Sequence, residues 1–283
     1  RLLNFVPTTI EKEEEKMPKK SYAKRDTTPD RVLENSYFVE ERNIEILVST
    51  CQDGNMDPRF SEDAKNNYRQ FLERFGLDAD DSFSPALGRS YRVITIDESN
   101  EARYAGRFIK NGTPQDEYQC DAVIISGSDL SVAFRVGDCP VALIFGKSPK
   151  AGTIMALIHA GRAELVTKVV KATVGQMNRD FQMHLRSATA YIFPHICKHC
   201  YLLQYVDPAT KEKAQDFLKF VDEHYHLDLM EWLKRQLNEA GIQRISTAFF
   251  RCTAGISPVC VSRLLHDMAK AKSKSLFFSH YRY

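Results

Sequence analysis

The chain has 283 residues, a formal net charge of +2 at pH 7 and an apolar content of 43%. This length buries one large hydrophobic core or two small ones. No apolar run approaches the roughly 20 residues that a membrane-spanning helix needs, and a near-neutral charge gives no indication of nucleic-acid binding. Seven scattered cysteines favour an intracellular, reducing compartment in which thiols act singly.

Residues 1–36 form a charged arm whose composition differs from that of the remaining chain. A Glu/Lys run covers residues 11–16, a basic run continues to Arg25, and few apolar residues accompany them. Such a segment becomes ordered only when something holds it, either a protein partner or the surface of its own domain. The arm is therefore expected at 1–36 and the folded domain at 37–283. Since the numbering starts at Arg1, a removed presequence and a mitochondrial location are compatible with the sequence, as is a cytoplasmic one.

Hydrophobic periodicity predicts strands and helices that alternate along the folded region. The helices are expected to begin near Ser61, Ala163, Asp207 and Asp228, and Gly76 and Gly241 to end the first and last. The strands are expected at residues 44–49, 91–96, 120–125, 131–136, 141–145, 153–158, 188–193 and 246–250. A turn at 127–129 joins the third strand to the fourth. The fold class is therefore α/β, a layered single domain with mixed β-sheets flanked by helices, plus an N-terminal extension.

Two short motifs place a thiol and an imidazole at neighbouring strand ends. Gly137-Asp138-Cys139-Pro140 follows one predicted strand, and Leu157-Ile158-His159-Ala160-Gly161 ends another. Cys139 and His159 are therefore candidate zinc ligands. They also fit a thiol–base dyad, for which Asp138 is the nearest orienting group in sequence. The structural alternative for Cys139 is a small buried apolar side chain.

Motifs spread over most of the folded region resemble the laccase-domain family of zinc purine nucleoside phosphorylases, which includes the YfiH-like proteins. The resemblance is carried by residues 120–124, 136–140, 157–161, 200–201, 252–253 and 277–282. It implies a zinc ion held by two histidines and one cysteine, with purine nucleosides and phosphate as substrates and phosphorolysis or adenosine deamination as reactions. Cys139 and His159 match two of the ligands. Arg162, His280 and Arg282 are expected to bind substrate.

Other positions depart from the family pattern. All eight histidines lie at or after His159, so the family's earlier histidine ligand is missing, and Asp97 or Glu98 is the candidate replacement. Arg162 replaces a tryptophan, and Leu202 replaces a glutamate. The zinc site therefore looks incomplete, and the sequence favours a relative that has lost catalysis and serves as a structural or binding subunit of a larger assembly. The alternatives are a working zinc-dependent purine nucleoside phosphorylase or adenosine deaminase, and a Cys–His thiol hydrolase.

Overall fold

The computed structural model describes residues 2–7, 36–39, 44–49, 53–88, 91–110 and 117–247. The strands are β1 (Leu2–Pro7), β2 (Ser36–Val39), β3 (Ile44–Val48), β4 (Ser82–Ser84), β5 (Val93–Asp97), β6 (Arg107–Phe108), β7 (Ala122–Ser126), β8 (Ser131–Arg135), β9 (Val141–Ser148), β10 (Gly152–His159), β11 (Thr189–Ile192), β12 (Leu202–Leu203), β13 (Leu218–Val221), β14 (His224–Leu227) and β15 (Arg244–Ser246). The helices are α1 (Ala64–Arg74), α2 (Glu101–Tyr104), α3 (Arg162–Val166), α4 (Val169–Phe181), α5 (Pro208–Lys213) and α6 (Leu229–Glu239), with 3-10 turns η4 (Leu185–Ser187) and η5 (Gln215–Phe217).

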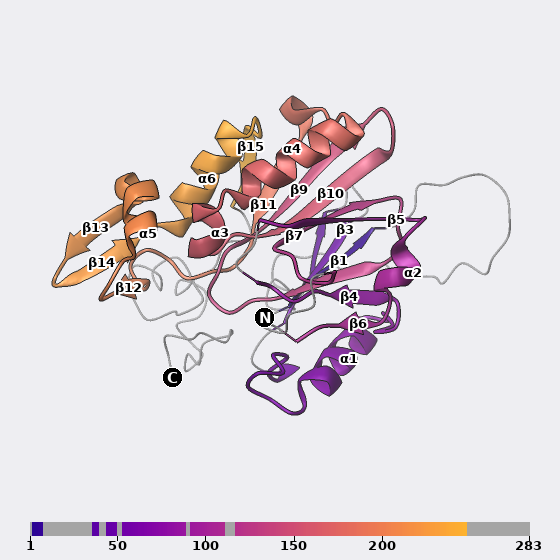
Figure 1. Cartoon of the computed structure of the whole chain (residues 1–283). Helices are drawn as coiled ribbons and strands as arrows, with labels where there is room; N and C mark the ends of the chain where they lie inside the picture. Colours follow the sequence, from indigo (N-terminus) through magenta and orange to yellow (C-terminus); the bar gives the residue numbers. More distant parts are fainter. Residues whose placement is uncertain are drawn as a thin grey trace, which may run out of the picture.

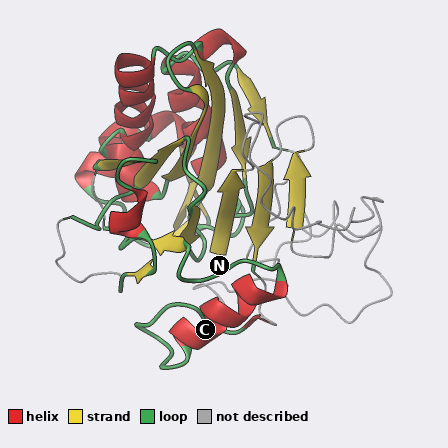
Figure 2. Cartoon of the chain, turned by 90° about the vertical axis from the view of Figure 1, so that its right-hand side faces the viewer, coloured by secondary structure: helices red, strands yellow, loops and turns green. Residues whose placement is uncertain are grey.

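These elements form stacked layers, as the α/β prediction required (Figure 1). One sheet has the strand order β2-β3-β1-β8-β4-β6, and a second has the order β15-β11-β9-β10-β7-β5. Helix α1 covers the outer face of the first sheet, while α3, α4 and α6 cover the outer face of the second. Figure 2 shows these two groups of helices on different sides of the strands. A small sheet with the order β12-β14-β13 adjoins them. No helix in the described ranges is both long and apolar enough to span a membrane.

The second sheet is buried on both faces, which explains its continuous apolar sequence. Along β9, Val141 and Leu143 face the first sheet, whereas Ala142 and Ile144 face the helices. β10 follows the same rule and pairs antiparallel with β9 and with β7. The site discussed below lies at one end of this buried hairpin.

The capping residues expected for the two C-terminal helices are confirmed. The Asp207 side chain accepts a hydrogen bond from the Thr210 amide at the start of α5, and Asp228 accepts one from the Glu231 amide at the start of α6. At α1 the expectation is wrong: the N-cap is Asp63, which makes no side-chain hydrogen bond to the helix, rather than Ser61.

Two connections also differ from the predicted arrangement. The single helix expected at 163–177 is divided into α3 and α4, because Lys168 adopts a left-handed conformation with φ of 60°. The turn at 127–129 leads from β7 in the second sheet to β8 in the first, so the chain crosses between layers there. No glycine or proline marks the break at Lys168, and the pattern of apolar residues continues across it.

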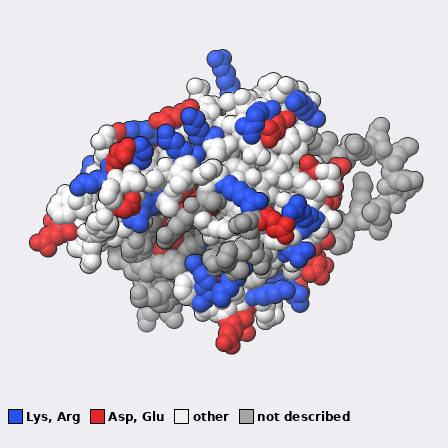
Figure 3. Space-filling view, in the orientation of Figure 1, with Lys and Arg blue, Asp and Glu red and all other residues white. Residues whose placement is uncertain are grey.

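Most of the charged arm lies outside the described residues, and its proposed contact with a partner stays a prediction. The described part, β1, lies between β3 and β8 and pairs antiparallel with both. Figure 3 shows lysine and arginine side chains interspersed with aspartate and glutamate over the visible face. On this face, the described residues of both signs are mixed, in agreement with a net charge near neutrality.

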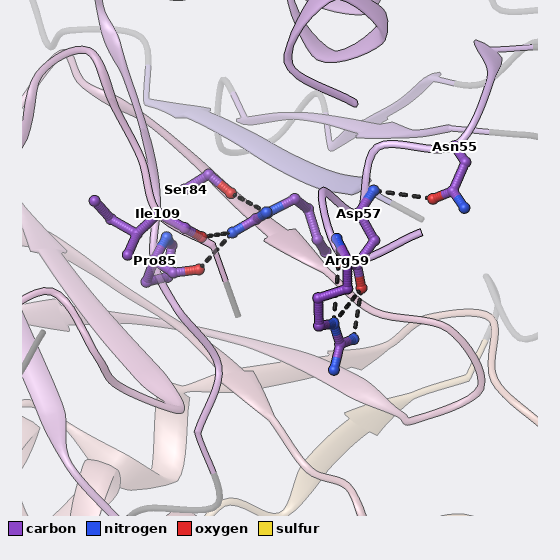
Figure 4. Close-up of polar contacts among 7 residues, drawn as sticks. Asn55, Asp57, Arg59, Ser84, Pro85 and Ile109 are labelled. Carbon is purple, nitrogen blue, oxygen red and sulfur yellow. Dashed lines mark hydrogen bonds and ion pairs between the residues drawn. The ribbon is translucent and has the colours of Figure 1, made fainter. Parts of the chain in front are cut away.

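The buried Arg135 guanidinium fixes the end of β8, from which the chain runs towards Cys139. It donates hydrogen bonds to the Ser84 hydroxyl at 2.9 Å, to the Pro85 carbonyl at 3.1 Å and to the Ile109 carbonyl (Figure 4). Burial lowers the pKa of Arg135 to about 10, and the Asp57 carboxylate opposes that shift, so the side chain stays charged at neutral pH. These contacts tie the residue after β6, the end of strand β4 and the approach to Cys139 into one unit.

Candidate functional site

Cys139 and His159 meet because β9 and β10 are antiparallel. His159, the last residue of β10, pairs with Val141, the first residue of β9, and Cys139 lies two residues before Val141. The Ala160 amide donates to the Pro140 carbonyl at 2.9 Å, which holds the two chain segments together beyond the last pair of the ladder. A Cβ atom built on Gly161 would lie 2.8 Å from Cys139 Sγ and 3.3 Å from His159 Nε2, so the two side chains lie close together. The prediction that a thiol and an imidazole meet at neighbouring strand ends is therefore confirmed.

A buried carboxylate orients the His159 ring. Asp121, which is fully buried and precedes β7, places its Oδ1 atom 2.9 Å from His159 Nδ1. The same oxygen accepts the Gly88 amide at 3.3 Å, and the Asp121 carbonyl accepts the His159 amide at 2.8 Å. With Nδ1 engaged by Asp121, Nε2 is the ring nitrogen left to face Cys139 and Gly161.

The same contacts control the charge of the imidazole. Burial lowers the pKa of His159, but hydrogen bonds that the ring donates to Asp121 and Cys139 outweigh that effect and raise the pKa well above its ordinary value of 6.5. The nearby Glu164 carboxylate acts in the same direction. Without a metal ion, both nitrogens of the His159 ring therefore carry a proton at neutral pH. A metal ion that binds Nε2 must displace the proton on that atom.

Glu164 brings a second buried carboxylate to this point. It lies in the first turn of α3 and is 3% exposed. Its Oε2 atom is 4.0 Å from His159 Nδ1. The possible ligand atoms of Asp121, His159 and Glu164 all lie within 4.8 Å of one another. We refer to Asp121, Cys139, His159 and Glu164 as the Cys139 cluster.

The space beside Gly161 shows that the donor atoms converge. A Cβ atom built on Gly161 would lie 2.5 Å from Glu164 Oε2, 2.8 Å from Cys139 Sγ and 3.3 Å from His159 Nε2. The backbone there, with φ of −68°, is accessible to any residue, so the glycine is required by space alone. Thiolate, imidazole and carboxylate are the three side-chain donors that zinc uses in proteins. The residues present therefore supply donor types that fit a zinc ion.

Access to the cluster is from the cysteine side. Cys139 is half-buried, whereas His159 is 9% and Asp121 0% exposed. A separate hollow of about 540 Å³ lies among α3, α4 and α6, with Lys171, Trp232 and Arg235 in its lining. No member of the Cys139 cluster lines it, so it is distinct from the site.

The other residues singled out in the sequence have mixed outcomes. Asp138 is buried, and the carboxylate that contacts the His159 ring is Asp121, so a role for Asp138 stays a prediction. Arg162 follows Gly161 directly and places its Nε atom 3.9 Å from Asp207 Oδ2, and its role in substrate binding stays a prediction. His280 and Arg282 lie outside the described residues.

Asp97 and Glu98 do not replace the missing histidine. β5 runs parallel to β7, with Val93 opposite Ala122 and Asp97 opposite Ser126. The Cys139 cluster lies at the Ala122 end, and four strand residues span roughly 13 Å. The side chain of Asp97 instead accepts hydrogen bonds from the amide and hydroxyl of Ser99.

Sequence reasoning missed two members of the cluster, Asp121 and Glu164. The signal for Asp121 was a carboxylate placed immediately before a fully apolar strand. The signal for Glu164 was an acidic residue three positions after Gly161, in the first turn of a helix that starts at the site. Both signals are weak alone, because acidic residues often cap strands and helices without any function.

Comparisons with known proteins identify relatives of this chain. The model of the family described as multi-copper polyphenol oxidoreductase laccase matches residues 50–283. A protein of Clostridium acetobutylicum named as a purine nucleoside phosphorylase is 27% identical over 128 residues, which cover 44% of this chain and 52% of that protein. The chain thus spans about half the length of the curated relative that it matches.

Solved structures resemble the fold. The YfiH protein of Bacillus licheniformis is 20% identical and gives a TM-score of 0.56, with 77% of this chain and 75% of that one covered. YlmD from Geobacillus stearothermophilus is 20% identical, with a TM-score of 0.55 and coverage of 78% and 75%. With a family model that matches residues 50–283, the chain belongs to the laccase-like, YfiH-type family of multi-copper polyphenol oxidoreductases.

Proposed function

We propose that this protein is a zinc-dependent enzyme that cleaves purine nucleosides with phosphate. The observation that carries the proposal is the convergence of the Cys139 thiol and the His159 imidazole beside Gly161, with Asp121 bound to the second ring nitrogen. A carboxylate behind a histidine ligand is a common arrangement around catalytic zinc. The class of substrate is taken from the name of the Clostridium acetobutylicum relative, a purine nucleoside phosphorylase.

The site residues have different roles in the proposed reaction. A phosphate oxygen attacks C1′ of the ribose, the N-glycosidic bond breaks, and the base leaves with the bonding electrons and takes up a proton. Zinc bound at the site would polarise an oxyanion or a water molecule. Asp121 holds the tautomer and orientation of His159, and half-buried Cys139 lies on the side from which substrate enters. Arg162, His280 and Arg282 are the proposed partners of phosphate oxygens.

A thiol hydrolase is the second candidate, because Cys139, His159 and Asp121 also have the order of a nucleophile, a base and an orienting carboxylate. The neighbouring Glu164 carboxylate disfavours this candidate. A second negative charge beside a developing thiolate destabilises it, whereas a divalent cation between the two stabilises both. The two candidates differ in whether a chelator abolishes turnover.

The non-catalytic subunit favoured by the sequence rested on several departures from the family pattern, the missing third ligand among them. Asp97 and Glu98 do not supply that ligand, but the buried Glu164 carboxylate lies 4.0 Å from His159, which supports an active enzyme. The arm that would dock such a subunit lies largely outside the described residues. The non-catalytic subunit would again be the favoured function if the folded protein binds zinc but turns over no nucleoside.

The deciding experiment measures base release from inosine and adenosine by the purified full chain supplied with zinc. Reactions with and without phosphate separate phosphorolysis from hydrolysis, and ammonia release from adenosine detects deamination. We expect base and ribose 1-phosphate to form in equal amounts. Cys139→Ala and treatment with a chelator should each abolish the activity.

Three results would contradict the proposal in different ways. Turnover that survives the chelator but not Cys139→Ala would identify a thiol enzyme. Turnover that survives Cys139→Ala would show that the Cys139 cluster is not the active site. An absence of turnover in zinc-loaded, folded protein would leave a binding or structural subunit.

A further inference from the structure

We propose that Glu164 is the third zinc ligand, so that Cys139, His159 and Glu164 form a site in which a carboxylate has replaced the family's earlier histidine. The inference rests on the proposed function only in taking zinc as the metal. It concerns this chain alone, because the replacement lies in a different segment from the histidine that is missing.

The burial of Glu164 is the first argument. Its side chain is 4% exposed, and the ion pair that the described residues provide for it is the 4.0 Å contact with the His159 ring. That ring is already bound to Asp121 at 2.9 Å. Two buried carboxylates therefore lie beside one imidazole, and the contact of Glu164 with it is the longer of the two. Buried carboxylates are usually paired or bind a metal ion, and a divalent cation at this position would give Glu164 such a partner.

Convergence on Gly161 is the second argument. Glu164 Oε2 is the closest of the three donor atoms to the position of a Gly161 Cβ, at 2.5 Å, followed by Cys139 Sγ and His159 Nε2. These three atoms therefore lie around one point beside the Gly161 backbone. Typical zinc bonds are about 2.0–2.3 Å long, so the three donor atoms would have to move closer together to bind one ion.

Asp121 is a carboxylate of the same cluster but a less suitable ligand. Its Oδ1 atom already binds His159 Nδ1 and the Gly88 amide, and a metal ion on that side of the ring would have to break both contacts. It therefore acts from behind the histidine. Asp97 lies at the far end of β5 and is too distant to contribute.

The test compares zinc affinity among variants of the full chain by competition with a chromophoric chelator. Glu164→Gln keeps the size of the side chain and removes its charge, and Glu164→Ala removes the ligand. We expect both to weaken zinc binding by more than the roughly 10- to 100-fold that loss of an outer-shell partner costs. Asp97→Asn and Glu98→Gln are matched controls that remove a carboxylate from the alternative positions, and both should bind zinc like the unsubstituted protein.

Cobalt absorption gives a second readout that does not depend on activity. Co²⁺ in the unsubstituted protein should show a thiolate charge-transfer band from Cys139 together with the intense visible bands of a four-coordinate site. In Glu164→Gln the charge-transfer band should persist at saturating cobalt while the visible bands change. Thermal unfolding of each metal-free variant confirms that the comparison is made among folded proteins.

The possible outcomes test the assignment of Glu164 as a zinc ligand separately from the proposed enzyme activity. Unchanged zinc affinity and cobalt spectra in both Glu164 variants would overturn the inference, even if nucleoside phosphorolysis is observed. Weakened zinc binding in the Glu164 variants, without turnover in the unsubstituted protein, would support the ligand and refute the enzyme. Failure of the unsubstituted protein to bind zinc with Cys139 would overturn the inference directly.

Discussion

Gly161 determines whether the Cys139 cluster can hold an ion. Its backbone angles suit any amino acid, yet an added methyl group would lie 2.5–3.3 Å from three donor atoms. We predict that Gly161→Ala abolishes zinc binding, because the methyl group occupies the space in which the donors converge. The measurement is the zinc content of the purified variant after dialysis, compared with the unsubstituted chain.

Gly175 supplies the control for that substitution. It lies in α4, and a Cβ atom added there meets no other atom within 4 Å. Gly175→Ala should bind zinc normally and raise the free energy of unfolding by about 0.5–1 kcal/mol, since alanine is the better helix former. Full zinc occupancy in Gly161→Ala would show that the ion, if any, binds away from Gly161.

At the scale of single elements, the boundary between α3 and α4 carries a strained residue. Lys168 has φ of 60°, a region that costs a side chain with a Cβ atom roughly 1–2 kcal/mol. We predict that Lys168→Gly raises the free energy of unfolding by about 0.5–1 kcal/mol, because glycine relieves the strain but has more entropy to lose on folding. Urea denaturation of the two proteins measures the difference.

The neighbouring Lys171 provides the matched comparison for this element. It is exposed and lies within α4, where glycine should lower the free energy of unfolding by about 1 kcal/mol. Opposite signs for Lys168→Gly and Lys171→Gly would establish the strain at position 168. A loss of stability in both variants would mean that the left-handed conformation of Lys168 costs little.

At the scale of the whole molecule, the charge of the Cys139 cluster links stability to pH. The pKa of His159 in the folded, metal-free protein lies well above 6.5, so folding favours the protonated ring. This contribution to stability is fully present below the unfolded value near 6.5 and is lost as the pH rises through the raised value. We predict that the free energy of unfolding of chelator-treated protein falls as the pH is raised above neutrality.

Asp121→Asn tests the origin of that dependence. The variant removes the main hydrogen-bonding carboxylate that raises the His159 pKa, so its stability should vary less with pH over the same range. With zinc bound, the free energy of unfolding of the unsubstituted protein should instead rise with pH. Zinc binding requires the unprotonated His159 nitrogen and therefore strengthens as the pH increases. If the stability of metal-free Asp121→Asn varied with pH as much as that of the metal-free unsubstituted protein, the pH dependence would not arise from the contact between Asp121 and His159.

The sequence predicted the layered fold well, because its strongest signals are local. The apolar runs of β9 and β10 and the caps Asp207 and Asp228 are readable without tertiary information. The break at Lys168 was not, since a left-handed lysine has no sequence signal. The pairing of Cys139 with His159 followed from neighbouring strand ends, whereas Asp121 and Glu164 join them through contacts between layers that periodicity does not encode.

The antiparallel hairpin of β9 and β10 gives the proposed metal site a further property. With Glu164 as a ligand, all three donors lie between residues 139 and 164, within one hairpin and the helical turn that follows it. Contacts between residues close in sequence form early, because little loop entropy is lost when they close. A zinc ion could then be captured by this hairpin before the two large sheets have assembled, and the bound ion would serve as a nucleus for the folding of the second sheet. In a protein whose third ligand came from the region of β5, capture would have to wait for strands about forty residues apart to meet.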